Sequence, residues 1–71
     1  MKLIDLLRLS NARFYVLEIY GANGQRAELD LDIEREADKY ELAKYAQAEV
    51  ARFQPIITDD DAPALEVELN A

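Results

Sequence analysis

The sequence predicts an α+β domain in which an antiparallel sheet of three or four strands packs on one long helix. Three observations predict this fold. Residues 13–33 alternate as a β-hairpin, residues 34–53 carry apolar side chains at helical spacing, and residues 64–69 alternate again as a strand. With 71 residues, the chain is expected to form a single small globular domain over residues 1–71.

The N-terminal segment, residues 2–9, fits either a short helix or a strand. Lys2, Asp5 and Arg8 fall on one side of a helical wheel, opposite leucine and isoleucine, which favours an amphipathic helix. Short terminal helices are marginal without tertiary packing, however, and residues 10–11 could equally form a hairpin turn. The sequence leaves both possibilities open.

The hairpin over residues 13–33 is the clearest local pattern. Residues 14–20 and 26–33 alternate between two faces, and Asn23-Gly24 between them supplies the positive φ angles of a tight turn. The expected inner face consists of Tyr15, Leu17, Ile19, Leu29, Leu31 and Ile33. A hairpin with one apolar face needs a covering layer, and the next segment of the chain is expected to provide it.

Residues 34–53 change to a period of three and four, which predicts one long helix across the sheet. The expected buried stripe is Ala37, Tyr40, Ala43, Ala46, Val50 and Phe53, with Leu42 and Tyr45 on its flanks. Asp32, or a capping box over residues 38–41, could start the helix, and Pro55 is expected to end it.

The last element is a strand over residues 64–69, after a polar loop over residues 58–63. Leu65, Val67 and Leu69 alternate with acidic residues and are expected to point inward. The Asp59–Asp61 run in the loop is typical of a solvated turn.

Composition excludes most catalytic chemistry. The chain has no His and no Cys, so it offers no imidazole base, no thiolate nucleophile and none of the usual structural zinc ligands. Ser10 and Thr58 are the only hydroxyls besides the tyrosines, and neither can have a histidine partner. No enzyme activity and no cofactor are therefore expected.

Neither a secretory signal nor a membrane span is recognisable. The first nine residues are interrupted by Lys2, Asp5 and Arg8, and the chain contains no apolar run of about 18 residues. The expectation is a cytoplasmic protein that does not engage a membrane.

Charge is strongly polarised along the chain. Residues 1–27 contain four basic and two acidic side chains, a net charge of +2, whereas residues 28–71 contain four basic and 13 acidic ones, a net charge of −9. Such surfaces repel phosphate, so direct nucleic-acid binding is not expected. A basic protein surface is the expected partner.

One acidic run has the spacing of a calcium loop. Asp30, Asp32, Glu34, Glu36, Asp38 and Glu41 occupy its ligand positions. Arg35 stands where that loop requires glycine, and the preceding residues alternate as a strand. No metal site is therefore predicted, and the carboxylates are expected to complement the dipole of the following helix.

The outer face of the hairpin is the candidate binding surface, because it mixes aromatic and acidic side chains. The candidate partner-binding residues are Phe14, Glu18, Tyr20, Glu28, Asp30, Asp32 and Glu34. Acidic residues at alternate strand positions are spaced by roughly 6.5–7 Å, close to a phosphate repeat, which would suit a DNA mimic. Two alternatives stay open: these residues satisfy strand propensity alone, or the N-terminal helix covers them.

Met1-Lys2-x-Ile4-x-x-Leu7, the strand ending at Tyr20, Asn23-Gly24 and the strand that follows resemble the N-terminal half of small phage-encoded anti-CRISPR proteins that block type I surveillance complexes. The resemblance covers residues 1–33. It implies an inhibitor that occupies a Lys-rich, DNA-holding surface of a host complex. The alternative function is a structural or assembly module that self-associates through its sheet, and either a monomer or a homodimer is compatible with the sequence.

Overall fold

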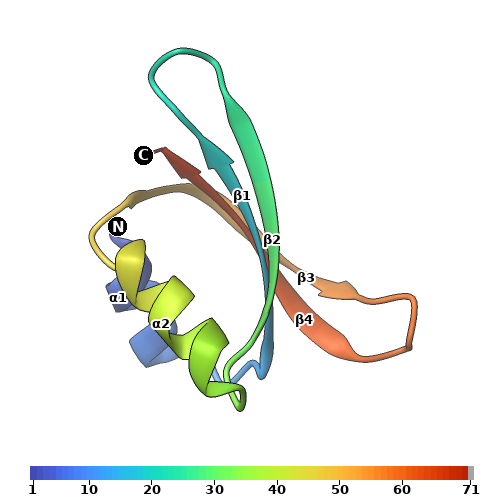
Figure 1. Cartoon of the computed structure of the whole chain (residues 1–71). Coiled ribbons are helices and arrows are strands. Elements are labelled where there is room, and N and C mark those ends of the chain that lie inside the picture. The colour runs from blue at the N-terminus through green and yellow to red at the C-terminus, as the bar shows by residue number, and fades with distance from the viewer. Residues whose placement is uncertain (71) are drawn as a thin grey trace.

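The computed structural model describes residues 1–70 and has an α+β fold, with a four-stranded mixed sheet and two helices on one of its faces (Figure 1). In chain order the elements are α1 (Leu3–Leu9), β1 (Phe14–Tyr20), β2 (Arg26–Asp32), α2 (Glu36–Lys44), β3 (Glu49–Ile57) and β4 (Pro63–Asn70). The strand order is β2-β1-β4-β3, so that two hairpins lie side by side. α2 carries the chain from one edge of the sheet to the other.

The expectation of a purely antiparallel sheet is wrong at one pairing. β1 pairs antiparallel with β2, and β3 with β4, but β1 and β4 are parallel, with Leu17 opposite Val67. A parallel pair needs a long connection. Here β2, α2 and β3 lie between the two central strands in sequence and supply it.

The predicted hairpin is confirmed. Tyr20 pairs with Arg26, Gly24 adopts a φ of 75° in the connecting turn, and the N–H of Gly21 donates to the carbonyl of Gln25 at 2.8 Å. Glycine is suited to this turn, because a side chain at positive φ is strained. Of the expected inner residues, Tyr15, Leu17, Ile19 and Leu31 are buried, whereas Leu29 and Ile33 are partly buried.

The expected single helix over residues 34–53 is wrong, since only Glu36–Lys44 is helical and β3 begins at Glu49. Arg35 is the N-cap, so neither Asp32 nor a box at residues 38–41 starts this helix. Its orientation also differs from the expectation: Tyr40 is 67% exposed, whereas Leu42 is buried. α2 and its C-cap therefore contact the core through Leu42 and Tyr45, which were expected only to flank the buried stripe.

A β-bulge explains the misleading spacing in residues 49–57. The register of β3 shifts between Val50 and Arg52, so that Val50 opposes Leu69 and Phe53 opposes Val67. Because the bulge adds one residue, two side chains three positions apart lie on the same face of the sheet. That spacing imitates a helix. Pro55 lies within β3, at a sheet edge where a missing N–H is tolerated.

The N-terminal segment forms a helix, Leu3–Leu9, rather than a strand, and Lys2 is its N-cap. The N–H groups of Leu3 and Ile4 donate to the carbonyls of Ala48 and Ala46, and the Asp5 carboxylate accepts the N–H of Lys2 at 3.2 Å. These bonds satisfy donors at a helix start that have no partner within the helix. α1 is thereby attached to the turn that follows α2.

The core lies between the sheet and both helices. Its buried residues are Leu3, Leu6, Tyr15, Leu17, Ile19, Leu31, Leu42, Val67 and Leu69. The expected strand over residues 64–69 is confirmed as β4, with Val67 and Leu69 fully buried and Leu65 partly buried. Tyr15 places its hydroxyl 3.1 Å from Ser10 Oγ, so its polar end is satisfied.

Replacing Leu17 with alanine tests this core. Leu17 is fully buried on a central strand, so Leu17→Ala is expected to lower the free energy of unfolding by about 2–5 kcal/mol. Urea denaturation followed by circular dichroism measures the change. Leu9→Ala is the matched control, because Leu9 is 76% exposed and its loss should change stability by less than about 0.5 kcal/mol. Equal losses in the two variants would contradict the described core.

Candidate functional site

No element of the described residues 1–70 covers the face of the sheet opposite the helices, which is called the open face (Figure 1). Its side chains are Arg26, Glu28, Asp30 and Asp32 from β2, Phe14, Val16, Glu18 and Tyr20 from β1, Ala64, Glu66, Glu68 and Asn70 from β4, and Arg52, Gln54 and Ile56 from β3. Successive side chains of a strand point to opposite faces of the sheet, and this alternation explains the composition. The leucine-rich positions face the helices, and the acidic positions face away.

Three glutamates form a row across the middle of the open face. Glu18 lies directly opposite both Glu28 and Glu68 on the neighbouring strands. Like charges at such positions repel one another. Arg52 pairs with Glu68 at 2.7 Å and Arg26 pairs with Glu18 at 3.3 Å, while Glu28 has no ion pair among those found in residues 1–70. The row therefore keeps an excess of negative charge.

Tyr20 contributes a further contact to this row. Its hydroxyl lies 3.1 Å from Glu18 Oε2 and donates a hydrogen bond to that carboxylate. The bond and the nearby negative charge raise the pKa of Tyr20, because they favour the protonated phenol. Tyr20 therefore remains a neutral donor.

Apolar side chains lie at one end of the open face. Phe14 and Ile56 flank Ala64 in a single cross-strand row, and Ala64 is only 5% exposed. The Arg13 guanidinium carbon lies 4.9 Å from the centroid of the Phe14 ring, a cation–π distance. Val16 continues this surface in the next row, where Asp30 and Glu66 stand on either side of it.

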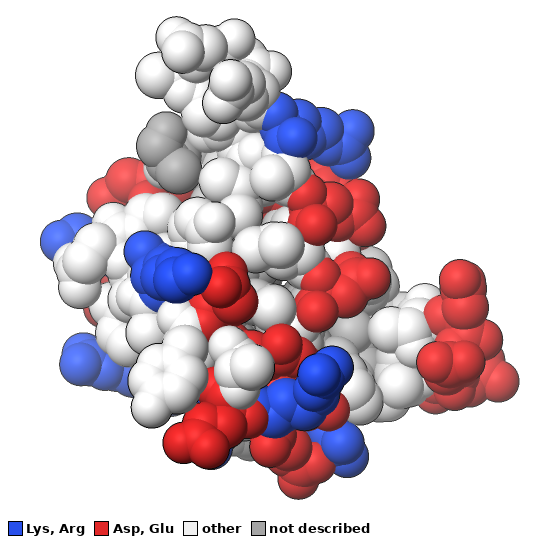
Figure 2. Space-filling model, viewed as in Figure 1, with Lys and Arg blue, Asp and Glu red and all other residues white. Residues whose placement is uncertain are grey.

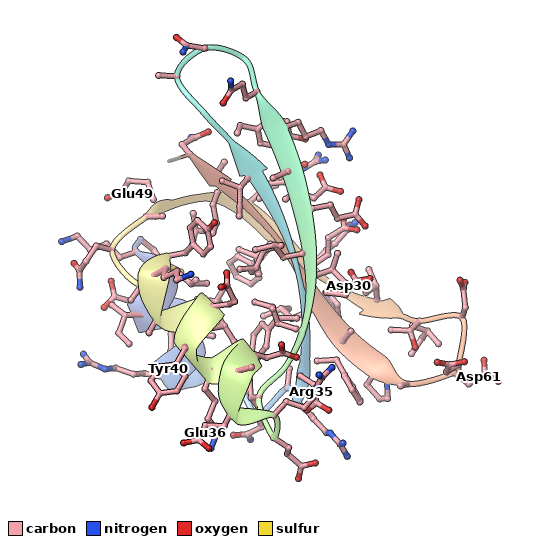
Figure 3. The ribbon with its side chains drawn as sticks, viewed as in Figure 1. Asp30, Arg35, Glu36, Tyr40, Glu49 and Asp61 are labelled. Atoms are coloured by element: carbon pink, nitrogen blue, oxygen red, sulfur yellow. The ribbon has the colours of Figure 1, made fainter. Side chains whose placement is uncertain are left out.

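This apolar surface is the floor of a groove of about 630 Å³ that extends from β2 to the turn of the β3–β4 hairpin. Acidic residues dominate its walls: Glu28, Asp30, Asp32, Asp38, Asp59, Asp60 and Glu66. Among the described residues that line it, Arg35 is the one basic residue. Figure 2 shows carboxylates gathered beside β2 and at the tip of the β3–β4 hairpin. In Figure 3 the side chain of Asp30 points away from the helices.

Asp32 has a structural role within this site. Its two carboxylate oxygens each accept a 3.1 Å hydrogen bond from Arg13, and one of them also accepts the N–H of Glu34 at 2.9 Å. The N–H of Asp32 in turn donates to Asp38 at 2.9 Å. The bonds from Arg13 and from the Glu34 backbone lower the pKa of Asp32, because they favour its ionised form.

The structure brings six of the seven candidate residues from the sequence onto one face of the sheet. Phe14, Glu18, Tyr20, Glu28, Asp30 and Asp32 lie together on the open face, whereas Glu34 lies beyond the end of β2 and pairs with Arg13 at 2.8 Å. Sequence reasoning missed Ile56, because the expected helix over residues 34–53 ended at Pro55 and no strand was predicted over residues 54–57, whereas β3 extends to Ile57. It also missed Glu66 as a neighbour of Val16, although the alternation of residues 64–69 already placed Glu66 on the outer side.

The carboxylates with calcium-loop spacing are spread over β2, the connecting turn and α2. Within residues 1–70, no three acidic side chains are placed so that they could hold a metal ion. Neither described helix is long and apolar enough to cross a membrane, since they have seven and nine residues.

Comparisons with protein-family models, with curated proteins and with solved structures found no match to this chain. Its function is therefore inferred from the chemistry of the open face.

The Arg13–Asp32 contact makes stability depend on pH. Because folding lowers the pKa of Asp32, its contribution is complete above the unfolded value of about 3.9 and is lost as the pH falls through the folded value. Asp32→Asn should therefore be less stable than the wild type at neutral pH, with a difference that shrinks below about pH 4. Urea denaturation over this pH range measures it.

Asp60→Asn is the control for this series, because Asp60 lies in the β3–β4 turn and no ion pair found in residues 1–70 includes it. Its difference from the wild type should not follow the same pH course. A difference for Asp32→Asn that stays constant with pH would contradict the assigned role.

Proposed function

We propose that this protein is a non-enzymatic binding protein whose open face occupies a basic surface of another protein. The observation that supports it is the groove, in which an apolar floor of Phe14, Val16 and Ile56 lies between acidic walls. Apolar and aromatic contacts supply binding energy, while complementary charge steers the encounter and selects the partner. Phosphate would be repelled from the same walls, which disfavours direct contact with nucleic acid.

The partner that fits this chemistry is a Lys- or Arg-rich protein surface, such as one that holds DNA. The resemblance of residues 1–33 to small phage-encoded anti-CRISPR proteins suggests one example, the DNA-holding surface of a type I surveillance complex in the cytoplasm of a phage host. In that role the protein is an inhibitor and a DNA mimic, and it requires neither catalysis nor a cofactor.

Asp30→Asn with Glu66→Gln tests the proposal, because these residues flank Val16 and neither has an ion pair among those found in residues 1–70. With octalysine as the probe, chemical-shift changes in a labelled protein should centre on the open face. The double variant should bind about 2- to 30-fold more weakly, from about 0.2–1 kcal/mol for each exposed charge pair.

Glu36→Gln with Glu41→Gln is the control for lost charge, since both residues lie on α2 and neither lines the groove; of the two, Glu41 pairs with Lys44 at 2.7 Å. Its affinity for octalysine should stay close to that of the wild type. Shifts spread evenly over all acidic residues, or equal weakening in both double variants, would refute a specific site on the open face. For the named example, excess protein should also prevent a purified type I complex from binding DNA.

Self-association through the sheet is the second candidate function, and a specific observation favours it. Phe53 and Ile57 lie on the helix side of β3 but are 49% and 66% exposed, because the end of the β3–β4 hairpin projects beyond the helices (Figure 1). Contiguous exposed apolar side chains are a common feature of interfaces between protein copies.

Sedimentation equilibrium separates the two functions. The binding proposal expects a monomer at micromolar concentration. A stable homodimer that Phe53→Lys converts to a monomer would instead favour the assembly module. Ala51→Lys, at another exposed position of β3, is the control for added charge.

A further inference from the structure

The two edges of the sheet differ in how they are protected. At β3, the carbonyl of Met1 accepts the N–H of Val50 at 2.8 Å, and Lys2 forms an isolated backbone β-bridge with Glu49. A bulge and Pro55 follow along the same strand. Each of these features hinders the addition of another strand. β2 has a regular register from Arg26 to Asp32 and contains neither a proline nor a bulge.

The hydrogen-bonding pattern shows which backbone groups of β2 face outward. The Gly21–Gln25 pair lies at one end of the hairpin, and the N–H of Ile33 donates to Arg13 at the other. Since bonded pairs alternate in an antiparallel ladder, Ala27, Leu29 and Leu31 bond to β1. The N–H and C=O groups of the residues between them therefore point away from the sheet.

Asp32 confirms this alternation, because its outward N–H is the one that donates to Asp38. Glu28 and Asp30 are the next outward residues along β2, and both have exposed side chains. These outward N–H groups do not take part in the β1–β2 ladder. Among the other hydrogen bonds found within residues 1–70, none uses the N–H of Glu28 or Asp30. The middle of β2 is thus an open template for strand pairing.

The two faces of this edge have different chemistry. Glu28 and Asp30 extend onto the open face beside the acidic groove. On the helix side, Ala27 is exposed and Leu29 partly buried, and Ala27 lines a second recess together with Ile19. A strand added here would meet carboxylates on one face and apolar surface on the other.

We infer that β2 binds an extended segment of the partner protein as a fifth strand, and that basic residues alternate with apolar residues in this segment. The inference rests on the proposed function, because it describes the part of a basic partner that the acidic face recognises. Backbone pairing supplies affinity, and the alternating side chains supply specificity. Lys or Arg side chains would lie opposite Glu28 and Asp30, which is a favourable cross-strand pairing.

A second copy of this chain fits the same edge poorly when the two β2 strands overlap fully. Antiparallel pairing centred on Leu29 brings Glu28 opposite Asp30 of the other copy on one face. Like charges directly opposite each other are destabilising. The charge pattern therefore favours a basic partner over self-association at this edge.

Amide hydrogen exchange on the full-length labelled protein tests the inference. The probe is a capped peptide of alternating Lys and Val, and the control peptide has the same composition with its lysines and valines in two blocks. In the free protein, the amides of Glu28 and Asp30 should exchange faster than those of Leu29 and Leu31. The alternating peptide should slow exchange at Glu28 and Asp30 by about tenfold or more, whereas the block peptide should not.

A pair of substitutions separates backbone pairing from charge. Asp30→Asn and Asp30→Pro both remove the carboxylate, but only proline removes the outward N–H, at an edge position where proline is tolerated. Asp30→Pro should therefore weaken binding of the alternating peptide clearly more than Asp30→Asn does. If Asp30→Pro does not fold, the exchange of the Glu28 and Asp30 amides in the wild type still decides whether the peptide pairs with β2.

The outcomes distinguish this inference from the proposed function. Peptide-induced shifts at Val16 and Glu66 without slower exchange at Glu28 and Asp30 would overturn strand addition and leave the binding proposal intact. An absence of shifts anywhere on the open face would overturn both. Equal protection by the two peptides would overturn the alternation of basic and apolar residues in the partner.

Discussion

The parallel pairing of β1 with β4 joins two hairpins that could not form stable units separately. An isolated two-stranded hairpin is at best marginally stable in water, and a sheet needs further strands and a covering layer. Leu17 and Val67, opposite each other on the two central strands, are both fully buried beneath the helices. The strand order, the position of α2 and the closure of the core all depend on this contact.

The same pairing creates the candidate site. Neither hairpin alone contains the groove, because its floor combines Phe14 and Val16 from one with Ile56 from the other. Its walls likewise combine Asp30 with Glu66. Fixing the core residues of β1 and β4 on the helix side forces their acidic neighbours onto the open face. The surface chemistry is therefore a direct consequence of the register that builds the core.

Sequence reasoning succeeded where the pattern was local. The hairpin, the β4 strand and the outward position of Glu28 and Asp30 all follow from alternation and one Asn-Gly turn. It failed where a distant contact decides the structure. The bulge in β3 gave Val50 and Phe53 the spacing of a helix, and only their pairing with β4 reveals them as strand residues. No local sequence pattern indicates the parallel contact between β1 and β4. The half of the groove that β3 and β4 contribute could therefore not be predicted from the sequence.

Under the proposed function, the row of Glu28, Glu18 and Glu68 would link the lifetime of this protein to its basic partner. Folding gathers these charges on three adjacent strands, whereas the unfolded chain keeps them apart. A basic ligand that neutralises the row binds the folded chain more tightly than the unfolded one, and mass action then shifts the population toward the folded state. Since proteases degrade the unfolded fraction, the abundance of the proposed basic ligand in a cell would then set how long the protein persists.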